Sequence, residues 1–145
     1  MRRDPREEAE RWWKQAVRDL EDAKFVFHGK RYNLACFLAQ QAAEKALKAY
    51  LYYMGEEFVP GNSVSDLCKR AMKYDEEFRG ICKAGVLDKY YIPTRYPNGL
   101  PGGVPYEAFD EYDAERAIPL AEMVIKFVKD KVEGIQGEGQ DREED

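Results

Sequence analysis

The chain has 145 residues, of which 44% are hydrophobic and 35% charged, and its formal net charge is -5. This length and composition are typical of a single globular domain with a modest core. The acidic balance argues against a general nucleic-acid-binding surface, which is usually basic, but it leaves room for a local basic patch. The high content of Glu, Lys and Arg is also typical of heat-adapted proteins.

The N-terminal stretch MRRDPREEAE is charged throughout, so it is not expected to be a signal peptide. The sequence has no run of about eighteen apolar residues, so we predict no membrane span. Cys36, Cys68 and Cys82 form no CxxC pair, and we expect buried thiols in a reducing, cytoplasmic setting rather than a disulfide framework. The sequence contains no metal-binding motif, P-loop or dinucleotide fingerprint, so we predict neither a metal nor a cofactor.

The first helix is predicted to start at Pro5 and stop at Gly29. Asp4 is its expected N-cap, and Glu7 is expected to complete a capping box. Apolar residues recur at spacings of three and four, which predicts a buried face made of Ala9, Trp12, Ala16, Leu20, Ala23 and Phe27. Trp12 and its neighbour Trp13 cannot both face one core, so one of them is expected at a helix or subunit contact.

A second helix is predicted from about Asn33 to Met54, and it carries two stripes at 4-3-4-3 spacing. The first consists of small side chains that would let another helix approach closely: Ala35, Ala39, Ala42, Ala46 and Ala49. The second is apolar at both ends and polar in the middle: Phe37, Gln41, Glu44, Lys48 and Leu51. The second stripe could be a pocket floor between helices or a solvated face with an i,i+4 ion pair. Its apolar ends favour partial cover.

A third helix is predicted from a cap at Ser63 to about Tyr74. A less regular one should follow over residues 75–90, weakened by two glycines. Asp113 is expected to cap the last helix, which would reach about Val132 and bury Ile118, Ala121, Val124 or Ile125, and Val128. The predicted fold is therefore an all-α, up-and-down bundle of four to five helices over residues 1–133. The tail GIQGEGQDREED, residues 134–145, is predicted to be disordered.

The segment YYIPTRYPNGLPGGVPYEAF, residues 90–109, holds four prolines, so no helix can run through it. We expect a stiff loop that crosses the bundle and delivers Arg95 to a groove. Arg95, with Tyr91 and Tyr96 beside it, is a candidate phosphate or base contact, because a guanidinium forks to phosphate oxygens and stacks on rings. Alternatively, Arg95 pairs with a carboxylate from Glu44 or the last helix, and this ion pair holds the loop against the bundle. The loop tyrosines could stack on bases, although packing on the bundle is their commoner role.

Three segments, NLACFLAQQAAEKALKAYL, GNSVSDL and LDKYYIPTRYPN, resemble the HEPN domain family (higher eukaryotes and prokaryotes nucleotide-binding). The resemblance covers roughly residues 8–130. It implies an up-and-down helical bundle that usually dimerises and binds nucleotides or RNA. It also implies, for many members, pairing with a small nucleotidyltransferase as toxin and antitoxin. Other members are metal-independent ribonucleases, whose signature is an arginine followed a few residues later by a histidine.

This sequence departs from the ribonuclease signature. No histidine follows Arg95, and the only histidine, His28, is better placed to interact with the negative end of the first helix. Asn62 stands where relatives often carry histidine. Metal-independent cleavage of a phosphodiester needs a proton-transfer group that titrates near neutral pH, usually histidine. We therefore do not expect catalysis.

Our first interpretation is a non-catalytic, homodimeric protein that binds a nucleotide or RNA and has a small nucleotidyltransferase partner. Its candidate ligand-binding residues are Arg95, Tyr91, Tyr96, Lys48, Glu44, Gln41 and Asn62. A second interpretation is a structural interaction module without a ligand site. A third is a ribonuclease with an atypical site.

Overall fold

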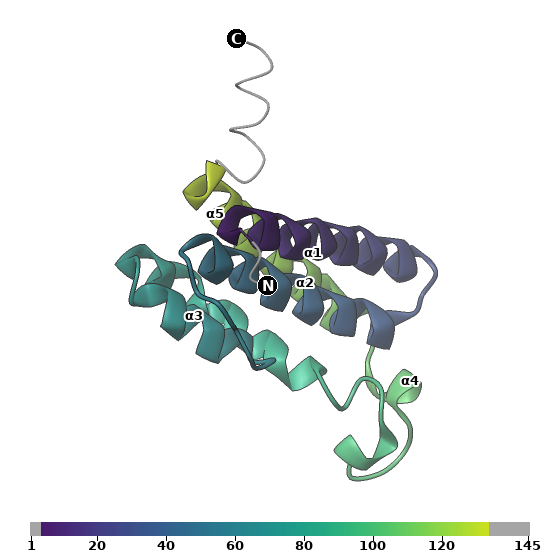
Figure 1. Cartoon of the computed structure of the whole chain (residues 1–145). Helices are drawn as coiled ribbons and strands as arrows, with labels where there is room; N and C mark the ends of the chain where they lie inside the picture. The colour runs from purple at the N-terminus through teal and green to yellow at the C-terminus, as the bar shows by residue number, and fades with distance from the viewer. Residues whose placement is uncertain (1–3, 134–145) are drawn as a thin grey trace.

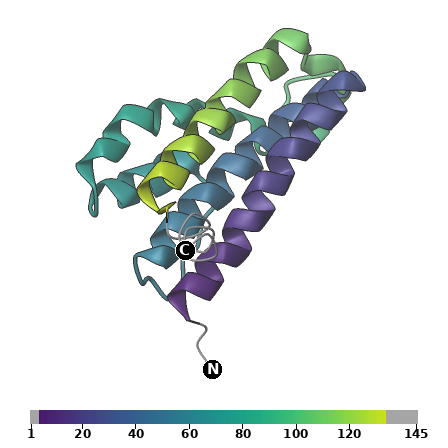
Figure 2. The same ribbon diagram turned by 90° about the horizontal axis from the view of Figure 1, so that it is seen from above.

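The computed structural model describes residues 4–133, which form an all-α bundle, as predicted. The long helices are α1 (Pro5–His28), α2 (Tyr32–Tyr53) and α5 (Glu111–Lys131). Figures 1 and 2 show these three running side by side. The predicted acidic tail lies outside the described residues. Within the described part of the chain, no helix is both long enough and apolar enough to cross a bilayer.

The second half of the bundle is built from shorter elements. α3 (Val64–Met72) packs on η1 (Glu76–Tyr90), a 3-10 helix, and the pair lies to one side of the long helices in Figure 2. Before α5 begins, the proline-rich segment carries the short 3-10 helix η2 (Pro97–Gly99) and the four-residue α-helix α4 (Pro105–Ala108). Helix α2 is central, because it contacts α1, α3, η1, α4 and α5.

The small residues of α2 form the predicted packing seam. The five alanines at positions 35, 39, 42, 46 and 49 are all fully buried. On α1, the prediction of the buried face was partly wrong, because Trp13 is the core residue, with 2% of its surface exposed, while Trp12 is half-buried. The expectation that the two tryptophans separate is confirmed. Trp12 lies at the contact between α1 and α2, stacked on Tyr52.

Two of the predicted helix caps differ in the structure. No side chain caps α1: Pro5 occupies its first turn, and the Asp4 backbone carbonyl accepts a hydrogen bond from Glu8 N–H instead. Helix α5 starts three residues earlier than predicted, because Asp110 is the N-cap and Asp113 is the third helical residue of a reciprocal capping box. The Ser63 cap of α3 is confirmed, with its hydroxyl accepting from Asp66 N–H.

The cysteine prediction was wrong for two of the three residues. Cys68 on α3 and Cys82 on η1 form a disulfide, with their Cα atoms 5.6 Å apart. Cys36 is a free thiol, and burial raises its pKa to about 12. Spacing along the chain could not reveal the pair, because the disulfide depends on how η1 folds back on α3. Gly85 makes that approach possible, since a Cβ there would lie 2.8 Å from the Cβ of Ser65.

The connection between α2 and α3 runs back along α2 (Figure 1). Val59 N–H donates to the Tyr52 hydroxyl, and the Asn62 carbonyl accepts from the Gln40 side chain. These two anchor points are twelve residues apart on α2, or about 18 Å at a rise of 1.5 Å per residue. Glu44 and Lys48 of the polar stripe lie between them in the sequence of α2.

Candidate functional site

Arg95 is held rigidly at the start of the proline-rich loop. Its Nε and Nη2 atoms donate to the Tyr91 carbonyl at 2.9 and 2.8 Å. The guanidinium carbon lies 4.1 Å from the centre of the Phe37 ring, 4.8 Å from that of Tyr91 and 5.1 Å from that of Tyr96. Such cation–π contacts orient the guanidinium and stabilise its charge. We call Arg95, Phe37, Tyr91 and Tyr96 the arginine platform.

The expected carboxylate partner of Arg95 is not found. Within residues 4–133, the polar contacts of its side chain go to the Tyr91 carbonyl, and neither Glu44 nor a carboxylate of α5 pairs with it. The prediction of an ion pair is therefore corrected: Arg95 stabilises the loop through a backbone oxygen and aromatic faces instead. One edge of the guanidinium is used, so the Nη1 side keeps its donors for another acceptor.

The loop beneath the platform is fixed by buried polar contacts. Thr94 is fully buried, and its hydroxyl donates to the Tyr90 carbonyl at 2.5 Å. The Thr94 carbonyl accepts from Asn33 at the start of α2 at 3.1 Å. The ring of Tyr90 is buried against Phe109, and this burial raises the pKa of Tyr90 to about 12. Because these bonds fix the backbone, the position of Arg95 is set in the free protein.

Glu44 and Lys48 form a buried pair rather than a solvated face, which corrects one of the alternatives for the polar stripe. Their exposed fractions are 3% and 6%, and Glu44 Oε2 lies 3.9 Å from Lys48 Nζ. The other carboxylate oxygen of Glu44 has no hydrogen-bond partner among residues 4–133. Burial raises the pKa of Glu44 to about 7, against the opposing effect of Lys48. The ammonium of Lys48 lies 5.0 Å from the centre of the Trp12 ring.

Asn62 contributes its backbone rather than its side chain. Its carbonyl accepts from Gln40 at 2.8 Å, and Gln41 in turn donates to the Gln40 side-chain oxygen. Gln40 also donates to Asp88 of η1 at 3.3 Å. The Asp88 carboxylate accepts from the Val64 and Ser65 backbone amides and from the Ser63 hydroxyl, so it stabilises the start of α3. This network joins α2, α3 and η1.

The seven predicted site residues therefore do not form one site. Arg95, Tyr91 and Tyr96 lie together over Phe37, in the first turns of α2. Lys48 lies eleven residues further along the same helix, or about 16 Å at 1.5 Å per residue. It contacts Trp12 rather than the platform. The platform is the part of the prediction whose side chains the structure brings together.

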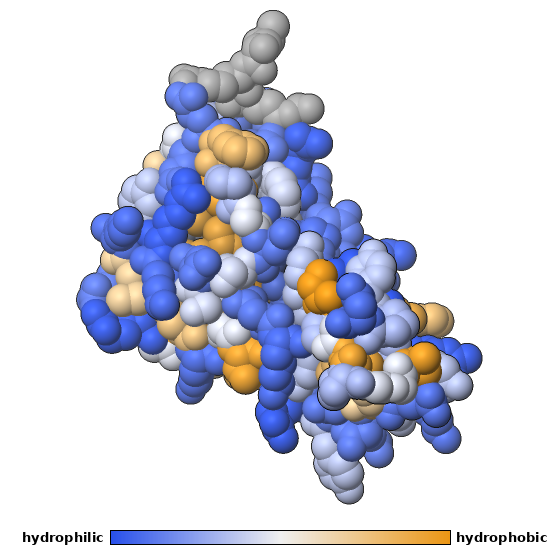
Figure 3. Space-filling model, turned by 90° about the horizontal axis from the view of Figure 1, so that it is seen from below, coloured by the Kyte–Doolittle hydropathy of each residue, from blue (hydrophilic) through white to orange (hydrophobic). Residues whose placement is uncertain are grey.

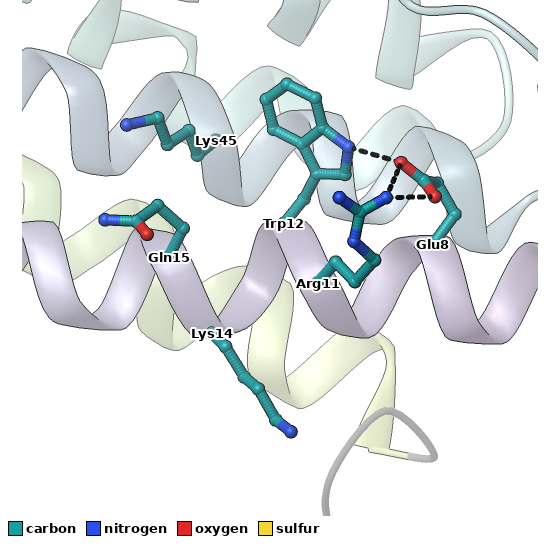
Figure 4. Close-up of a pocket in the computed structure, with 6 residues that line it drawn as sticks. All are labelled: Glu8, Arg11, Trp12, Lys14, Gln15 and Lys45. Atoms are coloured by element: carbon teal, nitrogen blue, oxygen red, sulfur yellow. Dashed lines mark hydrogen bonds and ion pairs between the residues drawn. The ribbon is translucent and has the colours of Figure 1, made fainter.

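A groove opens where α1 meets the second half of α2. It has a volume of about 540 Å³ and is lined by Glu8, Arg11, Trp12, Lys14, Gln15 and Lys45. Figure 4 shows Trp12 rising between Lys45 and Gln15 on one side and Arg11 and Glu8 on the other. The sequence did not predict this groove, because its residues come from two helices and become neighbours only when α1 packs on α2. The unused tryptophan was the one signal that pointed to it.

Apolar side chains are scattered over the face shown in Figure 3. They form separate patches among hydrophilic residues rather than one continuous surface. Large exposed apolar or aromatic side chains occur at Phe25, Phe58, Tyr96, Tyr106 and Tyr112. They come from α1, the α2–α3 connection, the proline-rich segment and α5. Tyr96 is the one that belongs to the arginine platform.

Comparison with known proteins identifies the family. The HEPN domain model matches residues 9–131. The chain belongs to the HEPN domain family. A curated relative from Methanocaldococcus jannaschii, "Putative toxin MJ1304", is 31% identical over 127 residues, which span 81% of this chain and 83% of the relative.

Three solved structures share the fold over nearly their whole length. TT1696 from Thermus thermophilus is 37% identical with a TM-score of 0.75, and the match covers 86% of this chain and 98% of that one. ST0689, an archaeal HEPN homologue, is 40% identical with a TM-score of 0.70, covering 85% and 96%. The HEPN domain protein tm0613 from Thermotoga maritima is 32% identical with a TM-score of 0.66, covering 85% and 98%.

Proposed function

We propose that this HEPN protein is a non-catalytic nucleotide- or RNA-binding protein that uses Arg95 as its phosphate contact. The observation that carries the proposal is the geometry of the arginine platform. Arg95 has one edge fixed by the Tyr91 carbonyl, lies against three aromatic rings and has no carboxylate partner within the described residues. A pre-positioned guanidinium with free donors binds phosphate at a low ordering cost.

Binding without catalysis fits the side chains around Arg95. The described groups in contact with its guanidinium are aromatic rings and a backbone carbonyl rather than a histidine or a carboxylate. The only histidine, His28, is exposed at the end of α1, where its ring contacts Phe27. A base for phosphodiester cleavage would have to come from elsewhere.

The biological setting that we propose is a toxin–antitoxin-like pair with a small nucleotidyltransferase, in which this chain acts as a homodimer. The name of the Methanocaldococcus jannaschii relative supports the toxin side of such a pair. A nucleotidyltransferase reading frame beside the gene, and a complex of the two proteins that survives gel filtration, would support the partnership. Light scattering should give twice the 16.8 kDa mass of one chain. A monomer at tens of micromolar would contradict the dimer.

The experiment that tests the ligand site is a titration of the protein with ATP and with a short single-stranded RNA, monitored by calorimetry. We expect Arg95→Ala to weaken binding by about 1–3 kcal/mol, the usual scale for a charge-assisted hydrogen bond. Arg95→Lys keeps the charge but loses the planar fork and much of the stacking, so it should restore only part of the affinity. Arg79→Ala is the matched control, because Arg79 is an exposed arginine of η1 paired with Glu76.

Melting curves of the same variants separate the proposed role from a structural one. Arg95→Ala removes two hydrogen bonds to a half-buried loop, so a loss of about 1–2 kcal/mol in the free energy of unfolding is expected. Unchanged binding together with a large loss of stability would refute the phosphate role. The interaction module without a ligand site would then be the better interpretation. RNA cleavage that survives stringent purification would refute the non-catalytic assignment.

A further inference from the structure

The α1–α2 groove and the arginine platform have complementary chemistry. Each cation that lines the groove already has a carboxylate partner: Arg11 pairs with Glu8 at 3.1 Å, Lys14 with Glu10 at 3.4 Å and Lys45 with Asp19 at 2.5 Å. The groove therefore offers little unpaired positive charge. What it does offer is the indole of Trp12, a flat aromatic surface that a planar ligand can cover.

Three contacts hold the half-buried Trp12 side chain in place. Its ring stacks on Tyr52 with centroids 5.7 Å apart and an angle of 24° between the planes. Its Nε1 donates to Glu8 at 3.0 Å, and the Lys48 ammonium lies 5.0 Å from the ring centre. These three contacts fix the indole, and the groove lies beside it (Figure 4). Rigid aromatic rings of this kind stack on nucleobases without regard to sequence.

A half-buried strip of α2 connects the two places. Phe37, Gln41 and Lys45 follow each other at intervals of four residues, so they lie on one side of the helix. Phe37 supports Arg95, and Lys45 lines the groove. Trp12 contacts Lys48, which lies eleven residues further along α2 than Phe37, or about 16 Å at 1.5 Å per residue. The interval is too long for the base and phosphate of one nucleotide, and a short strand can bridge it.

We propose that this strip carries a short single-stranded RNA, with a phosphate on Arg95 and a base stacked on Trp12. The inference rests on the proposed function, because the platform supplies its anchoring contact. It specifies that the ligand is an oligonucleotide of about four or more nucleotides, the lower end of single-strand site sizes. A mononucleotide reaches only the platform. Among the described residues of the platform and the groove, Arg95 is the cation without a carboxylate partner. The affinity for the oligonucleotide should therefore depend only weakly on salt.

The test is a length series of oligouridylates, from one to eight nucleotides, titrated into the full chain. We expect affinity to rise at least about tenfold between one and four nucleotides. Trp12→Leu should lower the affinity for the tetranucleotide roughly 5- to 150-fold, the range for losing one base stack. It should leave the affinity for UMP unchanged. Phe25→Ala is the control, because Phe25 is a 79% exposed aromatic residue of the same helix, outside the groove. It should bind like the wild type.

If Trp12→Leu fails to fold, quenching of the tryptophan fluorescence of the wild-type protein can still test the inference. Trp13 is 2% exposed and out of reach, so a base stacked in the groove quenches Trp12. The tetranucleotide should quench the wild-type emission, and UMP should not. Equal affinity for UMP and the tetranucleotide, without quenching, would overturn the inference and leave the proposed function intact. No binding by any of these ligands would overturn the proposed function as well.

One further outcome assigns the groove to a different partner. If Trp12→Leu lowers the mass in light scattering from dimer to monomer and leaves the binding of every oligonucleotide unchanged, the groove is a contact between subunits. The RNA assignment of the groove would then be wrong.

Discussion

Glu44→Gln should make the protein more stable at neutral and alkaline pH, and the gain should vanish in acid. Glu44 is 3% exposed, one of its carboxylate oxygens has no hydrogen-bond partner in the described part of the chain, and the other lies 3.9 Å from the Lys48 ammonium. Burial outweighs the attraction of Lys48 and Lys45, and Asp88 and Asp19 act in the same direction as burial. The pKa of Glu44 is therefore raised from 4.5 to about 7 in the folded protein.

The sign of the effect follows from proton linkage. Between pH 4.5 and about 7, folded Glu44 still holds its proton while unfolded Glu44 has lost it, so rising pH favours unfolding. One pKa unit corresponds to about 1.4 kcal/mol, so the contribution of Glu44 falls by about 3 kcal/mol across this window and is then constant. Glutamine carries no titrating proton. The difference in free energy of unfolding, variant minus wild type, should therefore rise by about 3 kcal/mol from pH 4 to pH 8.

Urea denaturation of both proteins at half-unit pH intervals measures this difference. Carboxylates that do not interact with Glu44 contribute equally to the stability of the two proteins, so their contributions cancel. Glu122→Gln is the control, because Glu122 is half-exposed and paired with Lys24, and its difference from wild type should change by less than about 1 kcal/mol. A Glu44→Gln difference that is flat with pH would refute the reasoning, because it would mean that Glu44 is solvated or fully compensated in the folded state.

Three further predictions concern the contacts that fix α3, η1 and the start of α5. Cys82→Ser, or a thiol reductant, should lower the free energy of unfolding by about 3 kcal/mol, because the disulfide closes a short loop; an unfolding midpoint that reductant does not change would contradict this. Gly85→Ala should cost about 1–3 kcal/mol through contact with Ser65, whereas Gly80→Ala, with open space around its Cβ, should be neutral or stabilising in the same melting experiment. Asp110→Ala removes the α5 capping box and should lower the free energy of unfolding by about 1 kcal/mol. Equal melting temperatures of the variant and the wild type would argue against that cap.

Most of the helical bundle was predictable from local patterns. Helices α1, α2 and α3 begin or end within about two residues of their predicted positions, because proline, glycine and serine act on the backbone next to them. The alanine seam of α2 was predictable because helical periodicity brings every third or fourth residue to one face. The α5 cap was misplaced because Asp110 and Asp113 are both good N-cap residues, and their reciprocal bonds set the order.

Most contacts of the candidate site could be identified only from the tertiary structure. Local sequence indicated that Arg95 would be stiffly held among tyrosines, because prolines restrict the loop on either side. It did not reveal that Phe37 lies beneath Arg95, since that depends on where the loop meets α2. It also did not reveal that the Tyr91 carbonyl, four residues upstream, takes the place of a carboxylate. The burial of Glu44, the disulfide and the Trp12 groove were likewise decided by contacts between different helices. Helical periodicity says which side of a helix is apolar, and only packing determines which neighbour covers its polar residues.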